Sequence, residues 1–243
     1  MHNQLRILLL FDVPFLAEPG YDFNHELNHL EEYRCERDVL MALRKLGHQV
    51  KPFGIYNNVE EVISELKSNH YDLVFFQCES VANERNHAAA LVSILEILNV
   101  KYTGADPDSM RICKDKSLTK KILSYHDIAV PQFQVIKYGT KPSFASNFPF
   151  PAIVKPATLE ASEGISQASL VHSHKAAERR CQFIMDHFED DVIVEEFIHG
   201  RELYVGVLGN ERITVFPPRE LLFTKHTKDK PLIATYKAKW DHE

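Results

Sequence analysis

The sequence predicts an α/β protein with two domains, because its pattern of apolar residues changes about 100 residues from the start. Up to that point short apolar runs alternate with segments of helical periodicity, as in the β-α-β units of a parallel sheet. Beyond it, apolar strands separated by loops predominate. The run Thr103–Pro107 interrupts the first rhythm, so we expect one domain over residues 1–104 and a second over residues 105–243.

The first domain is expected to be Rossmann-like. The run Tyr71–Phe76 is continuously apolar, which is typical of a parallel strand buried on both faces. Gly47 follows a long periodic segment and is a suitable helix end. The strands are expected at Arg6–Asp12, Gln49–Phe53, Tyr71–Phe76 and from Tyr102, and the helices at Leu27–Leu46, Val59–Lys67 and Ala88–Leu98.

The second domain is expected to begin with a helix over about Ser109–Tyr125 and to continue mainly as strands. A loop rich in Pro, Phe and Asn, Lys141–Pro151, separates the first two of these strands. The strands are expected near Pro131–Lys137, up to Lys155, and at Ile165–Val171, Asp191–Ile198, Glu202–Leu208 and Arg212–Phe216, with a helix at about His174–His187.

Charge and composition exclude several classes of protein. The formal net charge is −6, so no broad basic excess is present to meet a nucleic-acid backbone. The longest apolar stretches, Ile7–Phe11 and Ala88–Leu98, are too short or too interrupted to span a bilayer. The four cysteines are widely spaced, and no signal-peptide pattern precedes the first strand. We therefore expect a cytoplasmic protein that binds neither nucleic acid nor membrane.

The segment Phe150–Ile165 predicts a site for polyphosphate. It reads FPAIVKPATLEASEGI, an apolar strand that ends in Lys155 and is followed by a loop of small residues. A lysine at the end of a strand is held more rigidly than one on a loop. The backbone N–H groups of Thr158–Gly164, a stretch that includes Ser162, would lie over the phosphates.

The segment Val192–Gly209 predicts a site for a purine nucleoside. It reads VIVEEFIHGRELYVGVLG, a strand with two adjacent carboxylates, a break at Gly200, and Glu202 at the start of a second strand. An exposed strand end offers N–H and C=O groups to a purine edge, and a carboxylate can accept from ribose hydroxyls. Together, the two segments predict an ATP site.

Two further segments complete a resemblance to the D-alanine–D-alanine ligase branch of the ATP-grasp superfamily. Residues 101–123 read KYTGADPDSMRICKDKSLTKKIL, and residues 235–240 read TYKAKW. The resemblance implies that Lys116, Lys155 and Lys239 contact phosphate, with Trp240 in place of a loop-closing tyrosine. It further implies that Ser162 and Gly164 shape the phosphate loop, that Glu195, Glu196, Phe197 and Ile198 bind adenine, and that Glu202 binds ribose. Without it, Lys116 would be interpreted as part of a solvated helix face, and Glu196 as a solvent-facing strand residue.

Departures from the family's pattern limit what the resemblance implies. The phosphate loop has lost a glycine and a serine and has gained Glu160 and Glu163. The segments Val13–Gly20 and Gln77–Glu84 lack the motifs that hold the first D-alanine, so specificity for D-alanine is not expected. The family's metal-binding carboxylates lie beyond Glu243, so the ATP-grasp domain is expected to be incomplete.

The resemblance implies a carboxylate–amine ligase that uses ATP and Mg²⁺ and forms an acyl phosphate. The expected partners are ATP and a small amino acid or peptide, and a homodimer is a further option. The alternative is an ATP-binding fragment that is non-catalytic or regulatory. Since the metal ligands are expected outside residues 1–243, no residue of this chain is assigned to the metal.

A literal HExxH motif, His25-Glu26-Leu27-Asn28-His29, suggests a competing function. On a helix it places two imidazoles one turn apart, with a glutamate free to activate zinc-bound water. The chain contains thirteen histidines, so a chance match is not rare. The motif also falls on a crossover helix after the first strand, and we therefore expect no zinc site there.

Overall fold

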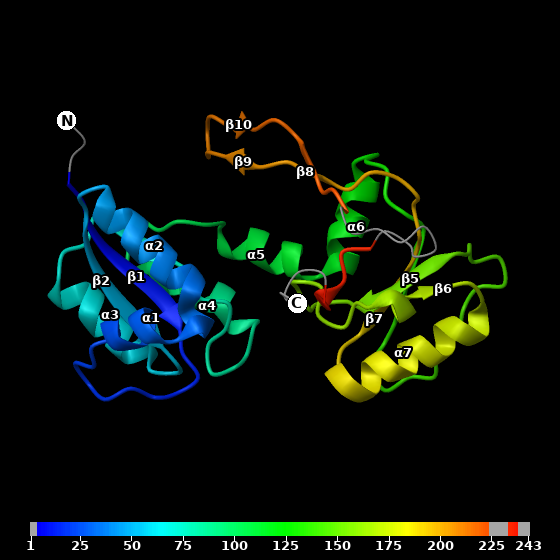
Figure 1. The fold of residues 1–243 in the computed structure, drawn as a ribbon, viewed down its shortest axis with the longest axis horizontal. Coiled ribbons are helices and arrows are strands. Elements are labelled where there is room, and N and C mark those ends of the chain that lie inside the picture. The colour runs from blue at the N-terminus through cyan, green and yellow to red at the C-terminus, as the bar shows by residue number, and fades with distance from the viewer. Residues whose placement is uncertain (1–3, 224–232, 238–243) are drawn as a thin grey trace. The chain divides into compact units, whose positions relative to one another are not determined.

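The computed structural model describes residues 4–223 and 233–237 (Figure 1). The chain forms two compact units, residues 1–111 and 112–243, which are described one at a time. The expected boundary after Gly104 lies shortly before this division.

The sheet of the first unit is parallel, as expected. Its strands are β1 (Arg6–Asp12), β2 (Gln49–Ile55) and β3 (Leu73–Phe76), in the order β2-β1-β3. Successive residues of β1 point to opposite faces of the sheet, so each face receives its own apolar core. Tyr102 adds only an isolated parallel bridge to Val74.

Helices cover both faces of this sheet. The core that contains Leu8 and Leu10 includes residues of α3 (Val59–Ser68) and α4 (His87–Ile97). The core that contains Leu9 and Phe11 includes residues of α1 (Asn24–His29) and α2 (Arg34–Lys45). The first unit therefore has the two-sided α/β arrangement of a Rossmann-like domain.

The single helix expected over Leu27–Leu46 is wrong. The segment is divided into α1, a 3₁₀ turn at Glu31–Tyr33, and α2. Leu30 is the dividing residue, and its extended backbone (φ −99°, ψ 127°) cannot continue a helix. The apolar spacing spans the break because residues on both sides of it pack into the same core.

The main sheet of the second unit is antiparallel. Its strands are β4 (Phe133–Ile136), β7 (Val192–Glu196), β5 (Ala152–Pro156) and β6 (Leu170–Val171), in the order β4-β7-β5-β6. The helix α7 (His174–Phe188) packs on one face, where Val154 and Val194 contribute to a common core (Figure 1). Because side chains alternate along a strand, Lys155 and Glu195 project from the opposite face.

The helix expected over Ser109–Tyr125 is also divided in two. The structure has α5 (Pro107–Lys114) and α6 (Lys116–Tyr125), separated by Asp115 in an extended conformation. The Asp115 side chain accepts hydrogen bonds from the N–H groups of Ser117 and Leu118, which makes it the N-cap of α6. The Asp115 carboxylate thus starts a new helix, whose first residue is Lys116.

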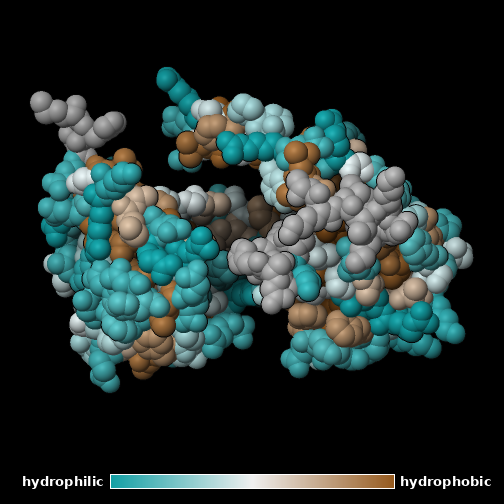
Figure 2. Space-filling model, in the orientation of Figure 1, coloured by the Kyte–Doolittle hydropathy of each residue, from teal (hydrophilic) through white to brown (hydrophobic). Residues whose placement is uncertain are grey.

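The strands expected after Gly200 are shorter than predicted and pair in two small sheets. β8 (Leu203–Tyr204) pairs with β11 (Arg219–Glu220), and β9 (Val207–Leu208) pairs with β10 (Thr214–Val215). The β9–β10 arm leaves apolar side chains exposed (Figure 2). The strand expected at Ile165–Val171 is likewise reduced to β6, preceded by a 3₁₀ turn at Gln167–Ser169. No helix among the described residues is long and apolar enough to cross a membrane.

Candidate functional site

The centre of the candidate site is Glu195, a carboxylate buried on β7. Its side chain is only 8% exposed, and each of its oxygens faces a different lysine. Oε1 accepts a hydrogen bond from Nζ of Lys155, and Oε2 lies 2.9 Å from Nζ of Lys120. Glu195 pairs in register with Ile153 across β5, so Lys155, two residues along on the same face, is its diagonal neighbour.

Lys120 was not predicted as a site residue. It belongs to α6, and its side chain is 14% exposed. Its Nζ also lies 5.9 Å from the centre of the Phe133 ring. Phe133 is the residue of β4 that pairs with Glu195 on β7. The sequence does contain a signal for it: Lys116 and Lys120 are four residues apart and therefore share one face of the helix. That face, interpreted without the resemblance as solvated, is turned toward the sheet.

Lys116 lies against the loop that follows β5. Its Nζ donates to the carbonyl oxygen of Leu159 and lies 3.4 Å from that of Ala157. Its backbone N–H also donates to the Ala157 oxygen, at 3.2 Å. Burial, followed by the charge of Lys155, lowers the pKa of Lys116. Lys155 is thus close enough to disfavour the charge of Lys116, a repulsion that a bound anion would relieve.

Lysines and carboxylates are mixed in this cluster, because Glu195, Asp190 and Glu160 all lie near Lys116. Burial alone would raise the pKa of Glu195, but Lys155 and Lys120 together lower it below its ordinary value. The carboxylate is therefore ionised, and one negative charge stands among three lysines. Asp190 adds a second carboxylate nearby, but it also accepts hydrogen bonds from the N–H and hydroxyl groups of Thr158, at 2.9 and 3.0 Å.

The loop from Thr158 to Ile165 is held at both ends. Asp190 fixes its start, and Arg180 Nη2 donates to the Gly164 carbonyl oxygen at 2.6 Å near its end. Gly164 has φ +69°, and a Cβ there would lie 2.7 Å from Cγ of Pro156. Ala161 and Ser162 also have positive φ, of 51° and 67°. Both residues therefore adopt a left-handed backbone conformation that a side chain disfavours.

A cavity of about 240 Å³ brings several predicted residues together. Four of them line it: Lys155, Ser162, Phe197 and Glu202. Two lining residues, Ile233 and Ala234, were not predicted, and no motif marks them. The remaining lining residues are Ile153 and Ile165. Phe197 and Glu202 also line a second cavity of about 310 Å³, together with Ile198, His199, Gly200, Arg201 and Phe223.

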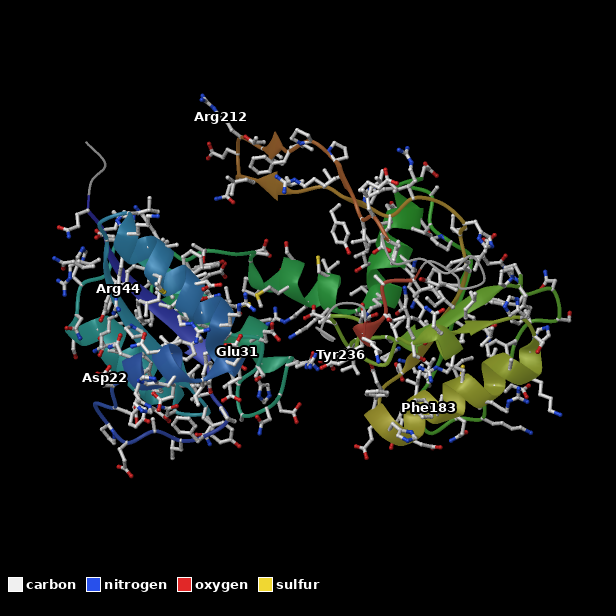
Figure 3. The ribbon with its side chains drawn as sticks, viewed as in Figure 1. Asp22, Glu31, Arg44, Phe183, Arg212 and Tyr236 are labelled. Carbon is white, nitrogen blue, oxygen red and sulfur yellow. The ribbon has the colours of Figure 1, made fainter. Side chains whose placement is uncertain are left out.

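The segment that contains Ile233 and Ala234 closes one side of this cavity. The Ser162 hydroxyl donates to the Ala234 carbonyl oxygen at 2.7 Å. The backbone N–H of Tyr236, labelled in Figure 3, donates to the Ile165 carbonyl oxygen at 3.1 Å. Residues 233–236 therefore join the phosphate loop to the cavity wall. The predicted residues Lys239 and Trp240 lie outside the described residues.

The four residues expected at the adenine edge differ in their hydrogen-bond and ion-pair partners. The Glu195 carboxylate is engaged by lysines, whereas Glu196 is half-buried and its N–H donates to the Gln132 oxygen at 2.8 Å. The Phe197 N–H donates to the Pro151 oxygen at 2.9 Å. Within the described part of the chain, the Ile198 N–H has no hydrogen-bond partner. Ile198 is therefore the first residue beyond the sheet that can offer its backbone N–H to a ligand.

The HExxH motif does not form a site of the zinc-protease type in this structure. Its helix, α1, has only six residues, and its two imidazole rings lie 4.7 Å apart. Glu26 is buried and accepts a hydrogen bond from the hydroxyl of Tyr21. Its carboxylate thus faces the protein rather than a metal-bound water. No group of three metal-ligating side chains occurs among the residues that the structure describes.

A match to a known protein family covers most of the second unit. A family described as "D-ala D-ala ligase C-terminus" matches residues 122–242. The D-alanine–D-alanine ligase of Desulforudis audaxviator is 29% identical over 78% of this chain and 60% of its own length. An uncharacterized protein, y4sG, of Sinorhizobium fredii is 28% identical over 85% of this chain and 60% of its own length. The chain thus spans about 60% of the length of these relatives.

A comparison of structures identifies the fold. The D-alanine–D-alanine ligase of Bacillus anthracis, in a crystal structure complexed with ATP, aligns with a TM-score of 0.61 at 18% identity, covering 87% of this chain and 70% of that one. The ligase of Coxiella burnetii aligns with a TM-score of 0.60 at 19% identity, covering 90% of this chain and 71% of that one. These likenesses show the ATP-grasp fold. Taken with the family match and the ligase relatives, they show that the chain belongs to the ATP-grasp superfamily, as a D-alanine–D-alanine ligase-like protein.

Proposed function

We propose that the second unit binds ATP and that this binding serves an ATP-dependent carboxylate–amine ligase. The observation that carries the proposal is the cavity beside Lys155, with Lys116 close by and the phosphate loop along its wall. Lysines from a strand and from a helix, beside the backbone of the phosphate loop, suit a polyphosphate. Family membership supports the class of reaction.

The phosphates would occupy the end of the cavity near Lys155 and the Ser162 loop. Lys155 and Lys116 would neutralise their charge, and the loop would supply N–H groups. The base would lie against Phe197 at the strand end, where the N–H of Ile198 is available. The Glu202 carboxylate, exposed and shared by both cavities, is placed to accept from the ribose hydroxyls.

In the proposed reaction, the γ-phosphoryl group of ATP passes to a carboxylate and ADP leaves. The amine then attacks the acyl phosphate and releases inorganic phosphate. The lysines would stabilise the charge that develops on the transferred group. In the family Mg²⁺ accompanies ATP, but the described residues hold no cluster of ligands that fits it.

The carboxylate substrate is proposed to be a small amino acid or peptide other than D-alanine, in a cytoplasmic setting that supplies ATP. The expectation rests on the segments Val13–Gly20 and Gln77–Glu84, which lack the motifs that the resemblance associates with the first D-alanine. In the structure, Asp12 accepts from the Glu79 N–H at 2.9 Å and from the Ser80 hydroxyl at 2.6 Å. These groups are thus engaged within the protein.

The alternative is a protein that binds ATP without turning it over. It would account for Glu160 and Glu163 in the phosphate loop, because carboxylates close to the transferred phosphoryl group would repel it. An assay of phosphate release with a panel of amino acids and dipeptides separates the two functions. Amine-dependent release supports the ligase, and ATP binding without release supports the alternative.

Titration calorimetry tests the ATP site itself. Lys155→Ala and Lys116→Ala should each weaken ATP binding by roughly 1.5–3 kcal/mol, the value of a hydrogen bond to a charged group. That loss is about ten- to a hundredfold in affinity. Lys121→Ala, an exposed lysine of the same helix, should leave the affinity unchanged. Unaltered ATP binding in both site variants would disprove the proposed site.

A further inference from the structure

We propose that Lys120 is a positioning residue that frees Lys155 for the nucleotide. While the site is empty, Glu195 holds both lysines. When phosphate is bound, Lys155 turns to it and Glu195 remains paired with Lys120. This inference rests on the proposed ATP site and adds to it a residue that the family resemblance does not assign.

The two lysines reach Glu195 from different elements and on different oxygens. Lys155 comes from the neighbouring strand β5 and meets Oε1, whereas Lys120 comes from α6 and meets Oε2 at 2.9 Å. Lys155 and Lys120 are 18% and 14% exposed, so both ion pairs are shielded from water. Neither oxygen is shared, and either pair can therefore open while the other remains.

Only one of the two lysines is placed to reach a ligand. Lys155 lines the cavity of about 240 Å³, and Lys120 is not among the residues that line it. Lys120 instead lies between Glu195 and the ring of Phe133. Lys155 is thus the lysine that can change partner, and Lys120 is the one that stays.

The physical need for Lys120 follows from the burial of Glu195. Removing one partner from a buried ion pair is costly because it leaves an uncompensated charge away from water. If Lys155 were the only partner of Glu195, its move to phosphate would leave the buried Glu195 carboxylate without a counter-charge. With Lys120 in place, the carboxylate keeps a cation and the transfer is less costly. The penalty that Lys120 removes arises only while residue 195 is charged.

This dependence on the charge of Glu195 provides the test. ATP and adenosine binding would be measured by calorimetry for the natural protein, Lys120→Met, Glu195→Gln and the double variant. Lys120→Met should weaken ATP binding by about tenfold or more while changing adenosine binding by less than about twofold. In the Glu195→Gln background, the same Lys120→Met change should alter ATP affinity by less than about threefold.

Several outcomes would overturn the inference. Unchanged ATP affinity in Lys120→Met would show that Lys155 is released without help. An equal loss in both backgrounds would show that Lys120 contacts phosphate directly or supports the fold in general. Should Lys120→Met fail to fold, Lys120→Gln takes its place in the same comparison, in both backgrounds. Absence of ATP binding by the natural protein would instead refute the proposed site, and with it this inference.

Discussion

Two carboxylates, half-buried Glu36 in the first unit and buried Glu195 in the second, both lose hydration, but their pKa values shift in opposite directions. Burial raises the pKa of Glu36, on α2 of the first unit, and the charges of Asp12 and Glu79 raise it further. Burial also acts on Glu195 in the second unit, but Lys155 and Lys120 lower its pKa overall. The loss of hydration is common to both, so the neighbouring charges decide the outcome.

The difference shows what kind of ligand each unit favours. Around Glu36, further acidic groups lie near the carboxyl ends of β1 and β3, and an anion would be repelled. Around Glu195, lysines from a strand and a helix lie among the acidic groups and supply cations that can pair with an anion. In two units whose sheets have a similar apolar core, the placement of a few charges therefore confines the proposed phosphate site to the second.

The largest expected effect comes from removing the central carboxylate of the second unit. Glu195→Ala leaves two buried lysines facing each other without a counter-charge, which should cost about 3–5 kcal/mol of unfolding free energy. Glu196→Ala, its half-buried neighbour, should stay within about 0.5 kcal/mol of the natural protein. Urea unfolding followed by circular dichroism measures both. Equal losses in the two variants would mean that the lysine–carboxylate cluster does not contribute to the free energy of unfolding.

A smaller loss is expected at the glycine that ends the phosphate loop. Gly164→Ala places a Cβ 2.7 Å from Cγ of Pro156 at φ +69°, and should destabilise by about 2–3 kcal/mol. Gly139→Ala is the matched control, since Gly139 has φ +74° but no atom within 4 Å of the added Cβ. It should cost about 1 kcal/mol. If both cost the same, backbone conformation alone explains Gly164, and the contact with Pro156 is unimportant.

In both units the sequence predicted the strands better than the ends of the helices. The strands were predictable because β1, β3 and β7 are dense apolar runs: most residues of β1 and β7 are buried, and those of β3 are buried or half-buried. The helix breaks at Leu30 and Asp115 were not, because the apolar spacing continues across them. At Asp115 a signal existed, since an aspartate two residues before Ser117 is a suitable N-cap.

The candidate site was predictable to a similar degree. Lys155, Ser162, Phe197 and Glu202 lie in contiguous motifs, and the structure places all four around one cavity. The pairing of Glu195 with Lys120 was not predicted, because it joins residues 75 positions apart on a strand and a helix whose packing the sequence does not specify. Ile233 and Ala234 were missed for the same reason, as their contact with the loop is long-range.

The cap of α6 tests whether the lysines of the second unit depend on their helix. Asp115→Ala removes the acceptor for two backbone N–H groups and should cost about 1 kcal/mol of unfolding free energy. Since Lys116 and Lys120 both extend from this helix, we also expect weaker ATP binding. Asp115→Asn keeps an acceptor oxygen and serves as the control. Stability equal to that of the natural protein in Asp115→Ala would contradict the capping role.

The smallest expected effect is a gain in stability, for a substitution of Glu36 in the first unit. Because the pKa of Glu36 is raised in the folded state, ionising it costs stability as pH rises through that pKa, and the cost is absent below the unfolded value of about 4.5. Glu36→Gln removes the ionisation, so at pH 8 the variant should be more stable by about 0.5 kcal/mol.

The pH profile separates this cause from a change in packing. The advantage of Glu36→Gln should grow from about pH 4.5 upward and become constant above the folded pKa, whereas a packing effect would be the same at every pH. Glu195→Gln should show the reverse, a loss of stability at neutral pH that diminishes as pH falls through the lowered pKa of Glu195. Urea unfolding at intervals from pH 4 to pH 8 measures both curves. Curves of the same sign would mean that the neighbouring charges do not distinguish the two carboxylates.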